Sequence, residues 1–136
     1  MMTETNCNKV LDELKRKKYN FGQSLRFIRE MQGLTIRRVA KEVNKTPTYI
    51  SDIERGNNKP PEKKLLIKLM EALSLHESEI EIQNYLFDLA AGERGGVSED
   101  IVDYIMKNSE LRMAIRMAQQ QDKGGKLWLD CVKSLQ

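Results

Sequence analysis

The stretch that most constrains the fold contains two very short segments with helical periodicity, residues 36–43 and 47–55, with almost no chain between them. Thr35 precedes the first segment and Thr46 precedes the second, and a hydroxyl side chain in this position caps the free N–H groups of a helix start. Pro47 opens the second segment, where its missing N–H is harmless and its fixed φ suits a helix. The pattern therefore predicts two short helices joined by a tight turn.

Two helices joined in this way form a helix-turn-helix, in which the second helix enters the DNA major groove with its N-terminal residues against base edges. Ile50 and Ile53 give the second helix an apolar underside, and Thr46, Thr48 and Asp52 are its exposed polar residues. The pattern predicts recognition of double-stranded DNA through this helix.

The rest of the chain is also predicted to be helical, because no segment alternates apolar and polar residues for long enough to indicate a sheet. Further helices are expected at 8–18, 21–32, 61–73, 77–91, 99–107, 110–121 and 126–135, with Ile80, Tyr85, Leu86, Leu89 and Ala90 facing inward in the helix at 77–91. The segment GERGG at 92–96 is the strongest break. We divide the chain into an N-terminal tail or short helix (1–18), a DNA-binding domain (19–91) and a helical C-terminal extension (97–136).

The stretch LTIRRVAKEVNKTPTYISDIERGNNKPP resembles the helix-turn-helix of the Xre/Cro/C1 family of phage-repressor-like transcriptional regulators. Ala40, Val43, Ile50 and Ile53 fall on the packing positions of that motif, and IERG followed by a polar loop and prolines is typical of it. The resemblance covers about residues 19–75. It implies an all-α fold with a five-helix DNA-binding domain, and a repressor that binds its operator as a dimer.

The resemblance also implies roles for individual residues. Arg29 is expected to form an ion pair with Glu54 at the end of the recognition helix. The loop after that helix is expected to contact phosphate. The full set of expected DNA contacts is Thr35, Arg37, Arg38, Thr46, Pro47, Thr48, Tyr49, Asp52, Arg55, Asn57, Asn58 and Lys59.

The sequence departs from better-known repressors at two positions, where Ile36 and Pro47 replace glutamines that brace the DNA backbone and read adenine. Neither side chain can form such hydrogen bonds, so few direct base contacts are expected. Thr48 can still hydrogen-bond a base or contact a thymine methyl group. Tyr49 either lies across the DNA backbone or packs on the loop. Asp52 either accepts from a cytosine amine or is a solvated acid that repels wrong bases.

Charge is distributed unevenly along the chain. Residues 1–64 contain 15 Lys and Arg against 8 Asp and Glu, whereas residues 65–136 contain 8 against 12. A basic front half favours a polyanionic partner such as nucleic acid. For Arg37 and Arg38 the alternatives are phosphate contacts and an ordinary solvated helix face.

Other classes of function have little support in the sequence. His76 is the single histidine, Cys7 and Cys131 are far apart, and neither a nucleophile–base pair nor a metal-ligand cluster is visible. We expect no catalysis, no cofactor and no metal. The chain lacks an apolar run long enough for a membrane span, so a cytoplasmic location and no membrane partner are expected.

The helices of the C-terminal extension have apolar faces, and these are expected to be buried in a contact with another helix or another chain. Two flexible methionines widen the apolar face of helix 110–121 and suit an adaptable contact surface. Three alternatives remain: packing within the monomer, a homodimer interface, or a surface for another protein such as a regulator or, for an antitoxin, its toxin. The expected interface residues are Leu111, Met113, Ile115, Met117, Leu127, Trp128, Cys131 and Leu135.

Overall fold

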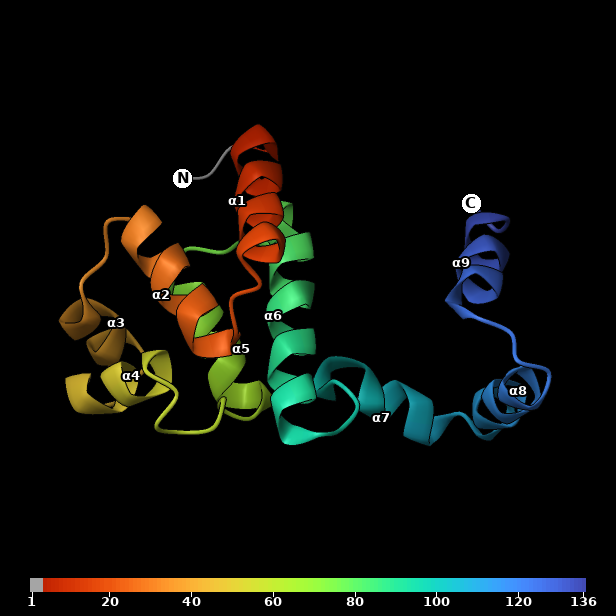
Figure 1. Cartoon of the computed structure of the whole chain (residues 1–136). Coiled ribbons are helices and arrows are strands. Elements are labelled where there is room, and N and C mark those ends of the chain that lie inside the picture. Colours follow the sequence, from red (N-terminus) through yellow and green to blue (C-terminus); the bar gives the residue numbers. More distant parts are fainter. Residues whose placement is uncertain (1–3) are drawn as a thin grey trace. The chain divides into compact units, whose positions relative to one another are not determined.

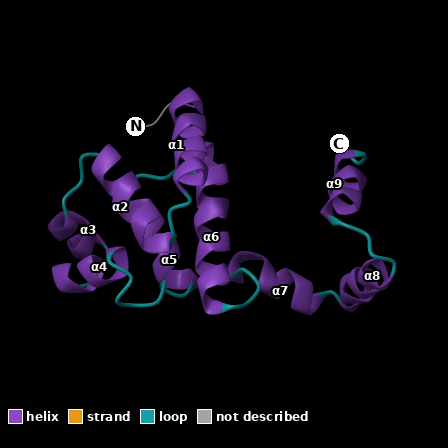
Figure 2. Ribbon diagram, viewed as in Figure 1, coloured by secondary structure: helices purple, strands orange, loops and turns teal. Residues whose placement is uncertain are grey.

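The computed structural model describes residues 4–136, and in that range it contains helices, turns and loops but no strand (Figures 1 and 2). This confirms the predicted all-α fold. The internal contacts divide the chain into two compact units after Asp100, and each unit is described by itself. None of the described helices combines the length and the apolar character that crossing a membrane requires.

The first unit consists of six α-helices and one short 3₁₀ turn within the described residues. They are α1 (Glu4–Lys17), α2 (Phe21–Met31), α3 (Ile36–Glu42), α4 (Pro47–Glu54), α5 (Lys63–Ala72), η1 (Glu77–Glu79) and α6 (Ile80–Arg94). In Figure 1, α3 and α4 lie together at one side of the unit, and α1 lies beside α6 at the other; both pairs are in contact. The helix-turn-helix therefore occupies one end of a larger helical scaffold.

One hydrophobic core holds this unit together. Leu14 of α1, Leu25 of α2, Ile53 of α4 and Leu86 of α6 are all buried in it. Burying a side chain of this size stabilises the fold by about 1.5–3 kcal/mol. The N-terminal helix is therefore part of the compact unit and not a separate tail, because α1 contributes to the same core.

Two tight turns depend on residues with positive φ. Gly33 follows α2 with φ of 69°, and Asn44 lies between α3 and α4 with φ of 58°. Asparagine is among the few residues besides glycine that adopt this left-handed conformation readily. Asn44 thus lets α4 begin almost immediately after α3.

The structure corrects one residue of the expected inward face of the helix predicted at 77–91. Ile80 is 51% exposed, whereas Ile82 and Phe87 are buried. Ile80 is the first residue of α6, directly after η1, and its side chain lies outside the core that the rest of the inward face enters. The other four predicted inward residues, Tyr85, Leu86, Leu89 and Ala90, are buried or partly buried in the core.

The end of the first unit also lies later than the sequence suggests. α6 continues to Arg94, so the segment 92–96 is largely helical, and the contacts divide the chain at Asp100. The helix α7 (Glu99–Lys107) begins at this point, and α8 (Ser109–Gln120) and α9 (Gly125–Lys133) follow. In residues 101–136 Ala118 is the one buried residue.

Candidate nucleic-acid interface

The two short helices begin where the capping pattern predicts. The hydroxyl oxygen of Thr35 accepts a hydrogen bond from the Arg38 N–H at 3.1 Å, and that of Thr46 accepts one from the Tyr49 N–H at 3.1 Å. Pro47 is the first residue of α4. Thr46, Pro47 and the following residue, Thr48, are exposed. The tip of α4 is therefore fixed in position and open to a partner.

The underside of α4 packs closely on the rest of the unit. Ile50 and Ile53 are each 1% exposed, and α4 contacts both α3 and α2. Gly22 of α2 lies against the end of α4: a Cβ atom there would lie 2.3 Å from the Ile53 carbonyl oxygen and 2.7 Å from that of Glu54. Only glycine allows the two backbones to approach this closely. Gly22 was not among the predicted residues, although a glycine inside a helix is a signal of close packing.

A buried ion pair holds the last residue of α4. The Arg29 Nε and Nη2 atoms donate to the two Glu54 carboxylate oxygens, each at 2.9 Å, and Nη1 donates to the Leu34 carbonyl oxygen at 2.9 Å. Both side chains are buried, and the hydrogen bond to Glu54 raises the pKa of the Arg29 guanidinium above its usual value. The pair therefore fixes the orientation of α4 relative to α2.

The solvent side of α4 presents few groups that are free to read bases. Thr48 is exposed and lies at the first turn. Asp52 is partly buried, and its Oδ1 accepts from the Arg55 Nη2 at 3.2 Å. Since these two charges compensate each other, a DNA contact by either one competes with their ion pair.

Tyr49 lies on the flank of α4. It packs against the edge of the core, and the Lys45 ammonium lies 5.4 Å from the centroid of its ring. Burial raises the pKa of the Tyr49 hydroxyl, so the phenol keeps its proton well above neutral pH. Tyr49 thus combines packing with a hydroxyl that is a hydrogen-bond donor.

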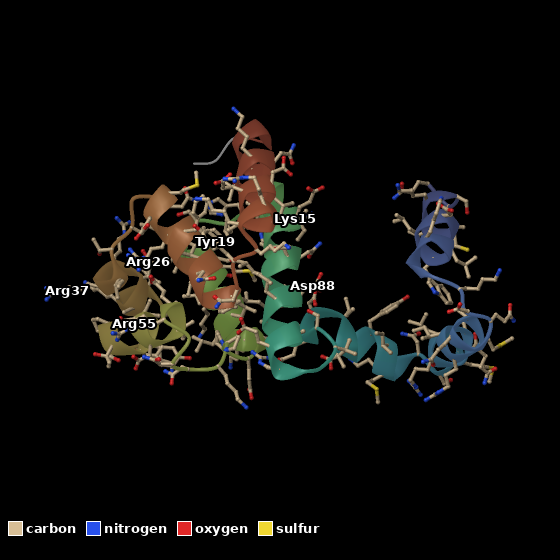
Figure 3. The ribbon with its side chains drawn as sticks, in the orientation of Figure 1. Lys15, Tyr19, Arg26, Arg37, Arg55 and Asp88 are labelled. Carbon is tan, nitrogen blue, oxygen red and sulfur yellow. The ribbon has the colours of Figure 1, made fainter. Side chains whose placement is uncertain are left out.

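The helix α3 carries two arginines in different situations. Arg37 is exposed and extends away from the ribbon in Figure 3, whereas the Arg38 Nε donates to the Glu42 Oε1 at 3.4 Å along the same helix. Ile36 is partly buried and packs against the core, so this position contributes packing where the better-known repressors carry a polar side chain.

The loop after α4 presents three polar side chains on a well-anchored backbone. Asn57, Asn58 and Lys59 are exposed, while Pro60 and Pro61 are buried. The loop begins with hydrogen bonds from the Asn57 and Asn58 N–H groups to the Asp52 carbonyl oxygen, at 2.8 and 3.3 Å. The exposed side chains are therefore attached to a backbone held at both ends.

Residues far along the chain hold the second end of this loop. Arg94 donates to the carbonyl oxygen of Pro60 at 2.9 Å, to that of Pro61, and to the carboxylate of Glu99. The second oxygen of Glu99 accepts from the Lys63 N–H at 2.9 Å, at the start of α5. The N-cap residue of α5 makes no side-chain cap of its own. We call Arg94 and Glu99 the loop clamp.

The loop clamp was not predicted, because GERGG at 92–96 is typical of a break between structural units. Glu93, in the same segment, accepts from the Phe21 N–H at 3.0 Å and so ties the end of α6 to the start of α2. The signal that could have revealed these contacts is the pair of charged residues, Glu93 and Arg94, between the glycines of this segment. Glu93 lies 72 positions from its partner Phe21, and Arg94 lies 34 and 33 positions from Pro60 and Pro61.

The predicted contact residues lie together on the helix-turn-helix and its adjoining loops. Arg26, Arg37 and Arg55 occupy the same side of the unit in Figure 3. Of the twelve predicted residues, Tyr49 and Asp52 are partly buried, and the exposed ones are Thr35, Arg37, Arg38, Thr46, Pro47, Thr48, Arg55, Asn57, Asn58 and Lys59. A fixed short helix with an exposed polar tip, supported by a crossing helix, defines the class of helix-turn-helix DNA-binding domains.

Comparison with known proteins agrees with this class. A family model described as helix-turn-helix matches residues 25–80, from within α2 to the start of α6. The chain carries a helix-turn-helix domain of the Xre/Cro/C1 type and is a DNA-binding transcriptional regulator. No curated protein and no solved structure matches it.

Proposed function

We propose that the protein represses transcription by binding an operator as a dimer, with α4 in the major groove. The observation that carries the proposal is the arrangement of α4. Its tip is exposed at Thr46 and Thr48, and its last residue is held by the buried Arg29–Glu54 pair. A helix fixed in this way can present the same side chains to base edges in every complex.

Base reading by this helix is sparse. Thr48 supplies the main direct contact, since Pro47 has no side-chain donor or acceptor and Asp52 is paired with Arg55. A bidentate contact is worth about 1–3 kcal/mol of discrimination, and a single hydroxyl supplies less. Much of the selectivity then comes from DNA shape and from the spacing of two half-sites.

The second unit supplies the dimer interface in this proposal. Apolar side chains are exposed along α8 and after α9: Met113 is 63%, Met117 52% and Leu135 85% exposed. A two-fold contact between copies would bury these side chains and place two recognition helices about 34 Å apart, one turn of DNA.

The experiment compares binding of the full chain to the DNA upstream of its own gene and to random duplex of equal length. The proposal predicts preferential binding to the upstream DNA, two chains per site, and lower expression of a reporter placed behind that DNA. Equal affinity for the two duplexes would overturn the proposal.

The second candidate function is that of an antitoxin, which neutralises a toxin and represses its own operon. The feature that favours it is the same exposed methionine surface, because flexible thioether side chains adapt to a protein partner. Co-expression with the product of the neighbouring gene tests it. A stable complex that protects cells from that product supports the antitoxin role. If the two proteins form no complex and the product is harmless to cells, the antitoxin role is excluded.

A further inference from the structure

An open groove of about 560 Å³ runs beside the recognition helix, between the turn that precedes α4 and the first two turns of α5. Four lysines line it: Lys45 from the turn, Lys59 from the loop after α4, and Lys64 and Lys68 from α5. We call this feature the lysine groove. Three of these lysines, Lys45, Lys64 and Lys68, are not among the predicted DNA contacts.

The charge of the lysine groove is uncompensated. Glu62 is the one acidic residue that lines it. None of the four lysines has a carboxylate within 4.0 Å among the residues that the structure describes, whereas Arg38 and Arg55 of the predicted interface each have one. Four lysines around one groove repel one another, so their concentration there favours an anionic partner.

The walls of the groove suit a partner that is charged but not purely ionic. The Tyr49 ring forms part of the lining, with the Lys45 ammonium 5.4 Å from its centroid, and Pro60 and Leu65 add apolar surface. A nucleic-acid backbone alternates phosphates with less polar sugars, and protein side chains contact both. A small inorganic anion would use the lysines and leave this apolar surface without a partner.

The groove is continuous with the helix-turn-helix. Tyr49 belongs to α4, and Lys59 lies in the loop after α4 that is predicted to contact phosphate. Lys64 and Lys68 are four residues apart on α5, so they lie on the same face of that helix. Lys59 and the two α5 lysines therefore line one groove beside α4 that a DNA strand could follow.

We propose that the lysine groove binds the phosphodiester backbone of DNA next to the base pairs that α4 contacts. This inference rests on the proposed function and extends the interface to α5. The contacts are electrostatic and independent of sequence, so they raise affinity for every duplex and increase its dependence on salt. They do not change the preference for one base over another.

The test measures the affinity of the full chain for upstream and random duplex over a range of salt concentrations. The variant is the double substitution Lys64→Ala and Lys68→Ala. The control is Lys9→Ala with Lys15→Ala, which removes the same charge from α1; Lys15 lies beside α6, away from α3 and α4, in Figure 3. Thermal unfolding of each variant shows that it is folded.

Each phosphate contact contributes about 0.9 to the slope of log affinity against log salt concentration. We expect the groove variant to lose about 1.8 units of slope on both duplexes, with the ratio of the two affinities unchanged, and the control to keep the wild-type slope. An unchanged slope in the groove variant, or an equal loss in the control, would overturn the inference.

The outcome is separable from that of the proposed function. If the wild type prefers upstream DNA and the groove variant keeps its slope, the groove inference alone is wrong. If the wild type binds both duplexes equally, the proposed operator binding is wrong, and the slopes on random duplex still decide the role of the groove. If inorganic phosphate at micromolar concentration protects the wild type but not the groove variant from thermal unfolding, the groove is a site for a small anion and the inference is overturned.

Discussion

Arg29 of α2 binds Glu54, the last residue of the recognition helix α4, through two hydrogen bonds of 2.9 Å between guanidinium and carboxylate. The third donor of Arg29 reaches the Leu34 carbonyl oxygen just before α3. One side chain thus sets the position of both helices of the helix-turn-helix. Bidentate pairs of this kind fix geometry as well as contributing energy.

We expect Glu54→Gln to destabilise the domain by about 3 kcal/mol, because it removes the charge that the buried Arg29 guanidinium contacts directly and leaves only the exposed Glu30 carboxylate, 4.0 Å away. Urea unfolding of the full chain measures this. The matched control is Glu42→Gln, which breaks the exposed pair with Arg38 on α3 and should change stability little. Equal effects of the two substitutions would show that the buried pair is not a structural link.

The close approach of α2 to α4 leads to a second prediction. Gly22→Ala should destabilise the domain by about 1–3 kcal/mol and weaken DNA binding, because the new methyl group collides with the carbonyl oxygens of Ile53 and Glu54. Gly92→Ala in α6 is the control: a Cβ there meets nothing within 4 Å, so the change should stabilise the helix by about 0.5–1 kcal/mol. Opposite signs in thermal unfolding support the account, and equal signs contradict it.

The loop clamp leads to a third prediction. Glu99→Gln removes the charge that Arg94 meets and weakens the cap at the Lys63 N–H, so stability should fall by about 1 kcal/mol. Affinity for upstream and random DNA should fall together, because the loop of Asn57 to Lys59 is less well held while the tip of α4 is unchanged. Glu110→Gln on α8 is the control. Loss of preference between the two duplexes in Glu99→Gln would contradict this assignment.

The second unit leads to a fourth prediction. Met113→Glu with Met117→Glu should convert a dimer to a monomer in sedimentation experiments, because four charges would enter each two-fold interface. Both methionines are exposed in the described chain, so the substitutions should leave the helical content of the monomer intact. A wild-type protein that is monomeric at tens of micromolar would contradict the dimer itself.

Local patterns were sufficient for the helix-turn-helix. Thr35 and Thr46 fixed the helix starts through hydrogen bonds to residues three positions later, which a sequence shows directly. The family resemblance supplied the partners Arg29 and Glu54, and the structure brings them together. These features depend on short separations or on a motif with a known geometry.

The rest depends on contacts between distant segments. A 3₁₀ turn comes before α6 and Ile80, the first residue of α6, is exposed, and no local pattern distinguishes this from a continuous helix that begins earlier. Arg94 reaches Pro60, 34 residues away, and the lysine groove brings Lys45 near Lys68. Such pairings follow from the tertiary packing of α3, α5 and α6, so the sequence alone does not reveal them.

The central claim is that the tip of α4 reads bases in the operator, and the most direct measurement is the ratio of affinities for upstream and random duplex in wild type and Thr48→Ala. Thr48 is exposed, so the variant should fold normally. We predict a wild type that prefers upstream DNA and a Thr48→Ala protein that loses most of this preference while keeping its affinity for random DNA. A Thr48→Ala protein with the full wild-type preference would contradict base reading by α4.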